Sequence, residues 1–312
     1  MRRTASLLCL VVWIGLWVEG LVRLAHWITP LERPAALYDT VRMRLLAGTW
    51  MDGPSRFYTY EPNMVGSTYG HPFRVNSEGF RGPEWRAKRH GITRVLVIGD
   101  SMTSGIGIAE KERYTEVAQR RRPDLDIINL SVQGWDAPQY AMALERYGEL
   151  LQPDIVVIGL YLNDPWTSFE FYAPYHPALP AWVALSLTYR LVEPFYDPLH
   201  RFTHGIPTRD QLMQQAYAPS SNDWQIFTAS LQRLVDWTER HSLRRPLALL
   251  LVNAPEATAT GYYAPLLAAC RALLAVCVEG VSRSRPVSRF EPHPDGTTQI
   301  QFGLRLAGAL PR

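Results

Sequence analysis

The clearest pattern along the chain is a series of short apolar runs that alternate with amphipathic segments. The first run, residues 94–100, is rich in valine and isoleucine, which is typical of a parallel strand buried on both faces. Strands that alternate with crossover helices form a parallel sheet with helices on both sides, so the pattern predicts a three-layer α/β/α fold. Strands are predicted at residues 94–100, 126–132, 154–160, 247–252 and 275–281, and helices at residues 110–121, 137–151, 223–241 and 262–273, with a last helix beginning near Phe302.

A different pattern occupies the N-terminus, where Arg2 and Arg3 precede an apolar run over residues 5–18. A helix from residue 4 to residue 25 would rise about 30 Å, enough to cross a bilayer. The sequence therefore predicts an export signal that serves as an uncleaved transmembrane anchor. Two N-terminal arginines would keep that end cytoplasmic and send the remaining chain to the other side of the membrane.

The uninterrupted apolar part alone has the length of a secretory signal, and Val18-Glu19-Gly20 would serve as a cleavage site. In that alternative the protein is secreted. The pair Glu19 and Arg23, at helical spacing, favours the anchor because charged residues mark the exit from a membrane.

The remaining chain divides by composition. Residues 1–28 form the predicted anchor, and residues 29–93, rich in proline, glycine and aromatic residues, form an extension of short strands and turns on the core. The regular α/β domain spans residues 94–312. A cap-like insertion at about 165–221, with a helix over residues 181–191, interrupts the α/β domain.

Composition and charge exclude several classes of function. The 312 residues are 47% hydrophobic and 20% charged with a net charge of +3, as in a globular protein, and no dense block of Lys and Arg suggests a nucleic-acid partner. No metal-binding motif and no dinucleotide or phosphate loop is present, so we expect neither a metal nor a cofactor. In an oxidising compartment Cys270 and Cys277 are either a disulfide or two buried thiols.

Polar residues lie at the ends of three successive predicted strands: Gly99-Asp100-Ser101, then Asn129 to Gly134, then Gly159 to Asp164. The carboxyl ends of parallel strands meet at one edge of the sheet, where ligands bind. Ser101 would stand there at the start of a helix, where free backbone N–H groups favour negative charge. Ser101 is therefore the candidate nucleophile.

The order and strand context of these blocks resemble the SGNH, or GDSL, hydrolases, whose blocks are Gly-Asp-Ser, a glycine after the second strand, Gly-x-Asn-Asp, and a C-terminal histidine preceded by a carboxylate. The likeness covers about residues 71–310, although Gly159-Leu-Tyr-Leu-Asn163 is longer than the shortest form of the third block. Residues 76–83 also look like a segment found ahead of Gly-Asp-Ser in membrane-anchored bacterial members. The resemblance implies a flavodoxin-like SGNH hydrolase fold over residues 94–312.

The same resemblance implies an oxyanion hole formed by the backbone N–H groups of Ser101 and Gly134 and the side-chain amide of Asn163. Three donors from adjacent strand ends would stabilise the negative charge that develops on an ester carbonyl. A side chain at position 134 would obstruct the carbonyl. Asp100 and Asp164 are interpreted as carboxylates that brace their loops through backbone N–H groups.

The general base is expected near the C-terminus, in Phe290-Glu291-Pro292-His293-Pro294-Asp295. By resemblance, His293 takes the Ser101 proton and Glu291, in place of the family's aspartate, orients it. Asp295 is the alternative orienting carboxylate, and His293 as a surface turn residue is the structural alternative.

The sequence thus predicts a serine esterase that acts on a small-molecule or glycan ester, with a small acyl group such as acetyl, and has no nucleic-acid partner. An O-acetyltransferase of cell-surface polysaccharide with the same site is one alternative. A catalytically degenerate glycan-binding or assembly protein is another, favoured by the altered ending around Glu291. The sequence does not identify protein partners.

Overall fold

The computed structural model describes residues 2–28, 43–50, 56–166, 207–288 and 291–311, together with residues 188, 203 and 205. Most of the predicted cap, including the helix expected over residues 181–191, lies outside the described residues. Within the cap region the structure describes α8 (Arg209–Ala216), which begins after its capping residue Thr208.

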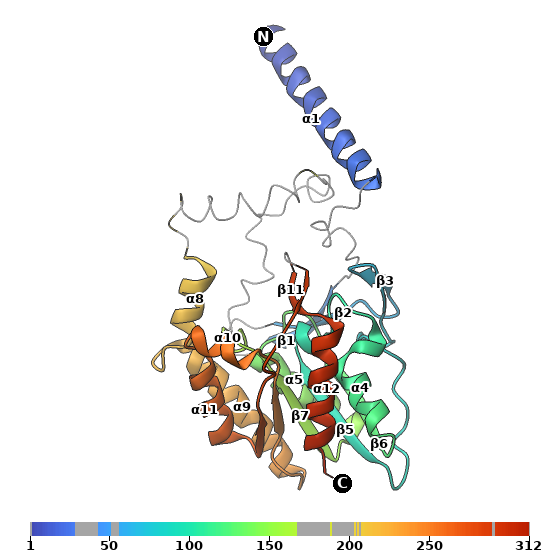
Figure 1. The fold of residues 1–312 in the computed structure, drawn as a ribbon, viewed down its shortest axis with the longest axis vertical. Coiled ribbons are helices and arrows are strands. Elements are labelled where there is room, and N and C mark those ends of the chain that lie inside the picture. Colours follow the sequence, from blue (N-terminus) through green and yellow to red (C-terminus); the bar gives the residue numbers. More distant parts are fainter. Residues whose placement is uncertain are drawn as a thin grey trace.

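A five-stranded parallel sheet forms the centre of the fold (Figure 1). Across the sheet the order is β6, β5, β7, β8, β9. The second strand of the sheet along the chain, β6, therefore pairs with one side of β5, and the three later strands continue the sheet from its other side. This is the flavodoxin-like strand order, and β5 lies where the order reverses. The predicted parallel sheet is confirmed; its strands are β5 (Thr93–Gly99), β6 (Leu125–Ser131), β7 (Ile155–Leu160), β8 (Leu247–Leu250) and β9 (Val276–Val278).

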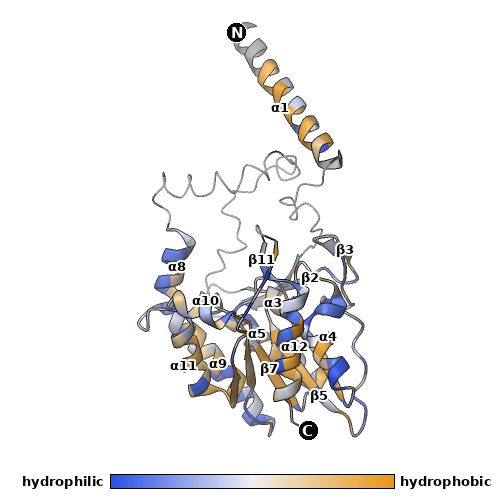
Figure 2. Ribbon diagram, viewed as in Figure 1, coloured by the Kyte–Doolittle hydropathy of each residue, from blue (hydrophilic) through white to orange (hydrophobic). Residues whose placement is uncertain are grey.

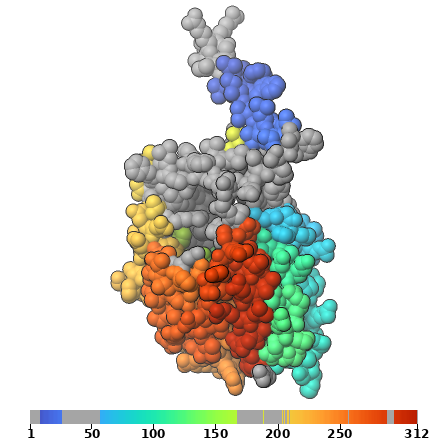
Figure 3. Space-filling view, in the orientation of Figure 1, coloured from blue at the N-terminus to red at the C-terminus, as the bar shows by residue number. Residues whose placement is uncertain are grey.

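Helices cover both faces of this sheet. Successive residues of a strand point to opposite faces, so each apolar strand contributes side chains to two separate cores. Leu96 and Ile98 of β5 belong to the core beneath α5, α9 and α11, whereas Val95 and Val97 belong to the core beneath α4 and α12. In Figure 3, α12 (red) and α4 (green) lie side by side on one face. The three-layer fold is therefore confirmed, with α4 (Tyr114–Arg121), α12 (Gly296–Ala309), α5 (Ala137–Leu151), α9 (Asn222–Arg240) and α11 (Tyr263–Leu273) as its main helices.

The described residues before the α/β core contain four strands, which form two antiparallel hairpins. Phe57, Tyr60 and Phe80 are fully buried in the same core as α5, and Phe57 contacts Trp135 with ring centroids 5.1 Å apart. These three residues of the N-terminal segment thus pack on the α/β core. Its strands are β1 (Met43–Trp50), β2 (Arg56–Tyr60), β3 (Val65–Thr68) and β4 (His71–Arg74).

The last helix begins earlier than the sequence predicts. α12 starts at Gly296 and not near Phe302, because the Asp295 carboxylate accepts the backbone N–H of Thr298 and caps the helix. A hairpin of β10 (Pro286–Ser288) and β11 (Glu291–Pro294) leads into α12. The short helix α10 (Ala254–Ala259) precedes α11.

The helix predicted over residues 110–121 is divided in two. Arg113 has an extended ψ of 141° and separates the 3₁₀ turn η1 (Glu110–Glu112) from α4. Its guanidinium is 1% exposed and donates to the Arg81 carbonyl and the Glu116 carboxylate. These contacts hold Arg113 at the break.

α1 (Arg2–Ile28) confirms the predicted N-terminal helix, and Figure 2 shows apolar residues over much of it. Within the ranges that the structure describes, however, no helix combines the length and the apolarity needed to span a membrane. The transmembrane assignment that the sequence suggests is therefore not supported.

Candidate active site

Ser101 lies at the carboxyl end of β5, where the strand turns sharply into α3 (Ser101–Ser104). Asp100 caps this short helix, because its Oδ1 accepts the Met102 N–H at 2.9 Å. Gly105 ends the helix with a left-handed φ of +74°. The turn holds Ser101 at the reversal point of the sheet, and the residue is buried, with 8% of its surface exposed.

His293 comes to Ser101 from the opposite end of the chain. Its Nε2 lies 2.8 Å from Ser101 Oγ, which is hydrogen-bonding distance. The residue is on β11, in the hairpin that leads into α12. A neutral imidazole in this position can accept the proton of the serine hydroxyl and so activate the oxygen as a nucleophile.

The two carboxylates proposed to orient His293 are placed differently. The side chain of Glu291 lies outside the described residues. The Asp295 carboxylate accepts the Thr298 N–H and the hydroxyls of Thr297 and Thr298, each at about 2.8–2.9 Å. The structure therefore places Asp295 in the cap of α12 and does not bring it to His293.

Gly134 and Asn163 follow β6 and β7, the strands on either side of β5. They therefore lie at the same edge of the sheet as Ser101. Neither the Ser101 N–H nor the Gly134 N–H donates to a described residue, and Asn163 Oδ1 is buried without a partner in the part of the chain that the structure describes. Gly134 has a φ of +80°, so the backbone itself favours glycine there.

Asp100 and Asp164 form a buried acidic pair behind the nucleophile. Burial raises the pKa of Asp100 from 3.8 to about 6, against the opposing effects of the Met102 N–H and of nearby His293. Burial also raises the pKa of Asp164 well above its usual value, and the nearby Asp100 carboxylate adds to this. Asp164 accepts the Tyr161 N–H and the Tyr140 hydroxyl, both at 2.8 Å, and so braces the loop after β7.

The raised pKa of Asp100 makes stability depend on pH. Between pH about 4 and 6 the folded protein holds a proton that the unfolded chain has lost, so the contribution of Asp100 is present below pH 3.8 and is lost as the pH rises through about 6. Asn cannot titrate. The free energy of unfolding of the wild type, minus that of Asp100→Asn, is expected to fall by up to about 3 kcal/mol between pH 4 and pH 7.

Urea unfolding at both pH values measures this difference. The control is Asp124→Asn. The hydrogen bond from Arg122 lowers the pKa of exposed Asp124, so the free energy of unfolding of the wild type, minus that of Asp124→Asn, should rise between pH 4 and pH 7. A wild-type-minus-Asp100→Asn difference that is independent of pH would contradict the assignment.

Several tyrosines that touch the site have no counterpart in the sequence prediction, Tyr60 and Tyr140 among them. Tyr140 donates to Asp164, and Tyr60 contacts both Ser104 and the backbone of Gln133. Tyr60 is 44 residues from Ser104 and 73 from Gln133, so no local motif could reveal the contact. The only signal was the aromatic content of the segment before residue 93.

No protein-family model matches the chain, and no curated protein matches it in sequence. Solved structures similar to it include TesA, with 15% identity over 69% of this chain and 96% of that chain and a TM-score of 0.42. The psychrotrophic esterase EstA from Pseudoalteromonas sp. has 13% identity over 70% and 96%, with a TM-score of 0.42. A lipolytic protein of the G-D-S-L family from Veillonella parvula has 9% identity over 70% and 98%, with a TM-score of 0.41.

Proposed function

We propose that the chain is a serine esterase of the SGNH type, with Ser101 as nucleophile and His293 as base. The observation that carries the proposal is the distance of 2.8 Å between His293 Nε2 and Ser101 Oγ, two residues that the sequence resemblance selects from opposite ends of the domain. The N–H groups of Ser101 and Gly134, which donate to no described residue, support it further, because an acyl-transfer site needs donors for an oxyanion.

In the proposed reaction Ser101 Oγ attacks the carbonyl carbon of an ester while His293 Nε2 takes the hydroxyl proton. The carbonyl oxygen becomes an oxyanion, which the N–H groups of Ser101 and Gly134 and the amide of Asn163 stabilise. The intermediate collapses to an acyl-serine and releases the alcohol, which takes the proton from His293. Water then attacks the acyl-serine by the same steps and frees the carboxylic acid and Ser101.

The proposed acyl group is small, such as acetyl, and the proposed substrate is a glycan ester. This part rests on the family resemblance and not on a described binding pocket. Purified protein should hydrolyse p-nitrophenyl acetate faster than the octanoate ester and should release acetate from acetylated xylan. Acetyl transfer to an added oligosaccharide in preference to water would instead assign an acyltransferase, and glycan binding by folded protein that is inactive on every ester would assign a binding protein.

The side-chain amide of Asn163 should contribute to the rate of the chemical step. Asn163→Ala is expected to lower kcat by about 10²- to 10³-fold with little change in KM, because the amide acts on the oxyanion more than on the bound ester. Steady-state kinetics on p-nitrophenyl acetate measures the effect. Gln232→Ala removes an exposed amide of α9 and should leave both constants unchanged; an equally active Asn163→Ala protein would contradict this role.

The proposal also places the α/β domain outside the cytoplasm. Cys270 on α11 and Cys277 on β9 form a disulfide, with Cα atoms 6.1 Å apart, and Cys270 is fully buried. Structural disulfides persist in oxidising compartments, which supports export. In protein isolated from its host and unfolded without reductant, both cysteines should resist alkylation until a reductant is added. Alkylation of both before reduction would contradict export.

A further inference from the structure

We infer that Tyr58 and Tyr60 of β2 are positioning residues for the oxyanion hole, and that the segment before the α/β domain therefore completes the active site. The inference rests on the proposed function and deepens it. It concerns residues 132–135, called here the oxyanion loop, which carry the Gly134 N–H.

The oxyanion loop is a turn whose central peptide can face either way. Trp135 N–H donates to the Val132 carbonyl at 3.2 Å, and Gly134, with its φ of +80°, occupies the third position. Gln133 has no positive φ, so the turn is of type II. Types I and II differ by a half-turn of the central peptide, here the one that joins Gln133 to Gly134. A change of type would reverse the direction of the Gly134 N–H.

Tyr58 holds this same peptide. Its hydroxyl donates to the Gln133 carbonyl at 3.0 Å. In a trans peptide the carbonyl and the N–H point in opposite directions, so this hydrogen bond fixes the Gly134 N–H away from Tyr58. That N–H donates to no described residue, as an oxyanion donor requires.

Tyr60 holds the N–H group of the same residue, Gln133. Its fully buried hydroxyl accepts the Gln133 N–H at 2.8 Å and lies 2.7 Å from Ser104 Oγ at the end of α3. One hydroxyl therefore joins the loop that carries Gly134 to the helix that begins at Ser101. The indole Nε1 of Trp135 donates to the Tyr58 carbonyl at 2.9 Å and gives the loop a third bond to β2.

β2 is itself held by the turn at residues 76–83. The Tyr60 N–H donates to the Gly79 carbonyl at 3.0 Å. Gly79 has a φ of +91°, and a Cβ there would lie 2.5 Å from Thr59 Oγ1, so only glycine allows this approach. Asn76 Oδ1 accepts the N–H groups of Glu78 and Phe80 and closes the turn.

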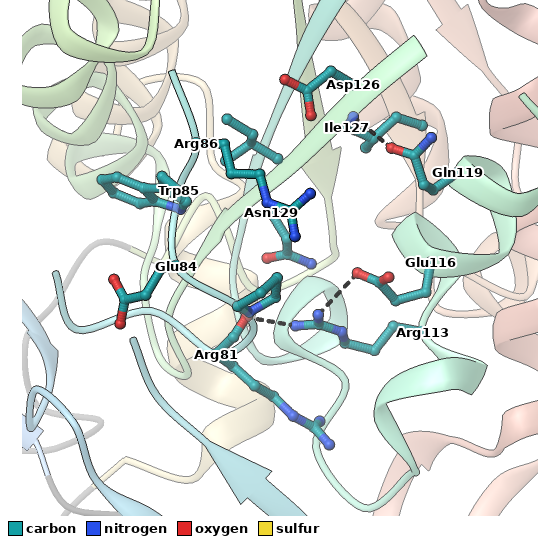
Figure 4. Close-up of a pocket in the computed structure, with 12 residues that line it drawn as sticks. Arg81, Glu84, Trp85, Arg86, Arg113, Glu116, Gln119, Asp126, Ile127 and Asn129 are labelled. Atoms are coloured by element: carbon teal, nitrogen blue, oxygen red, sulfur yellow. Dashed lines mark hydrogen bonds and ion pairs between the residues drawn. The ribbon is translucent and has the colours of Figure 1, made fainter. Parts of the chain in front are cut away.

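Arg81, in the same turn, reaches the far end of α3. Its buried guanidinium donates to the carbonyls of Ser104, Gly105 and Ile108. The Arg81 carbonyl in turn accepts from the Arg113 guanidinium, and a dashed line in Figure 4 marks this hydrogen bond. The segment thus contacts both the nucleophile helix and the oxyanion loop.

The test is Tyr58→Phe, which removes one hydroxyl and keeps the ring. Without this hydroxyl the central peptide can rotate, so the Gly134 N–H no longer always faces the oxyanion. We therefore expect kcat on p-nitrophenyl acetate to fall about 10- to 100-fold with KM nearly unchanged. This fall is smaller than the one expected when an oxyanion donor is removed. Rates are expressed per active site, titrated with a fluorophosphonate. Affinity for a trifluoromethyl ketone, which forms a tetrahedral oxyanion on serine, should fall by the same factor as kcat.

A merely structural role would lower the number of titrated sites and leave kcat per site and ketone affinity unchanged, and that result would overturn the inference. The control is Tyr262→Phe, whose hydroxyl lies 3.5 Å from the Asp210 carbonyl, and it should keep wild-type constants. If the wild type hydrolyses no ester and titrates no site, the proposed function fails. If the wild type is active and Tyr58→Phe equals it, only the inference fails.

Discussion

Ser101→Ala is expected to reduce kcat/KM on p-nitrophenyl acetate by about 10⁴- to 10⁶-fold. The methyl group cannot attack the carbonyl, so no acyl-serine forms and the reaction loses its two-step route. The remaining rate over water would come from the oxyanion donors and from substrate binding. The side chain is almost buried and small, so the variant should fold.

The matched control for this variant is Ser230→Ala. Ser230 is also a buried helical serine, but it lies on α9, where its hydroxyl bonds to the Ile226 carbonyl. Its loss should leave kcat/KM unchanged. Wild-type hydrolysis by Ser101→Ala protein would show that another residue is the nucleophile.

His293→Ala is expected to cost nearly as much, because without Nε2 at 2.8 Å the Ser101 hydroxyl keeps its proton at neutral pH. The two residues act as one unit. Their losses should therefore not add, and the double variant should be about as active as either single variant. The measurement is kcat/KM for the two single variants and the double variant, with circular dichroism to show that each is folded.

His241→Ala is the control for the loss of an imidazole. His241 caps α9 and stacks on Trp237 with ring centroids 3.9 Å apart, remote from Ser101 in the fold. Its loss should leave kcat/KM unchanged, although it should lower stability slightly. If the double variant lost the product of the two single effects, Ser101 and His293 would not act as a unit.

The sheet was predictable because its strands are buried on both faces. A run such as residues 95–99 is apolar at every position, which is typical of a central strand between two helical layers. The breaks in the helical pattern were harder to predict. The sequence offers Asp295 as the alternative carboxylate for orienting His293, whereas in the structure its carboxylate caps α12, which begins at the next residue. The interruption at Arg113 depends on a contact with Arg81, 32 residues away, and leaves no local signal.

In the site, residue types that carry chemistry were easier to find than residues that position them. Ser101 and His293 stand in recognisable motifs, and the structure brings them together. Tyr58 acts through a backbone carbonyl 75 residues away, a contact that any strand tyrosine could make. The type II turn likewise explains Gly134 through its backbone conformation, whereas sequence reasoning explained it through space for the substrate.

The most direct test of the central claim is the site of covalent modification by a fluorophosphonate, mapped by peptide mass spectrometry on the full-length protein. A phosphonate reacts with a serine only when a base activates it and donors stabilise the phosphoryl oxygen. The account predicts one adduct per chain, on Ser101, and at least about 10³-fold slower labelling of His293→Ala protein. Folded wild-type protein that takes up no label, or that carries it on another residue, would contradict the account.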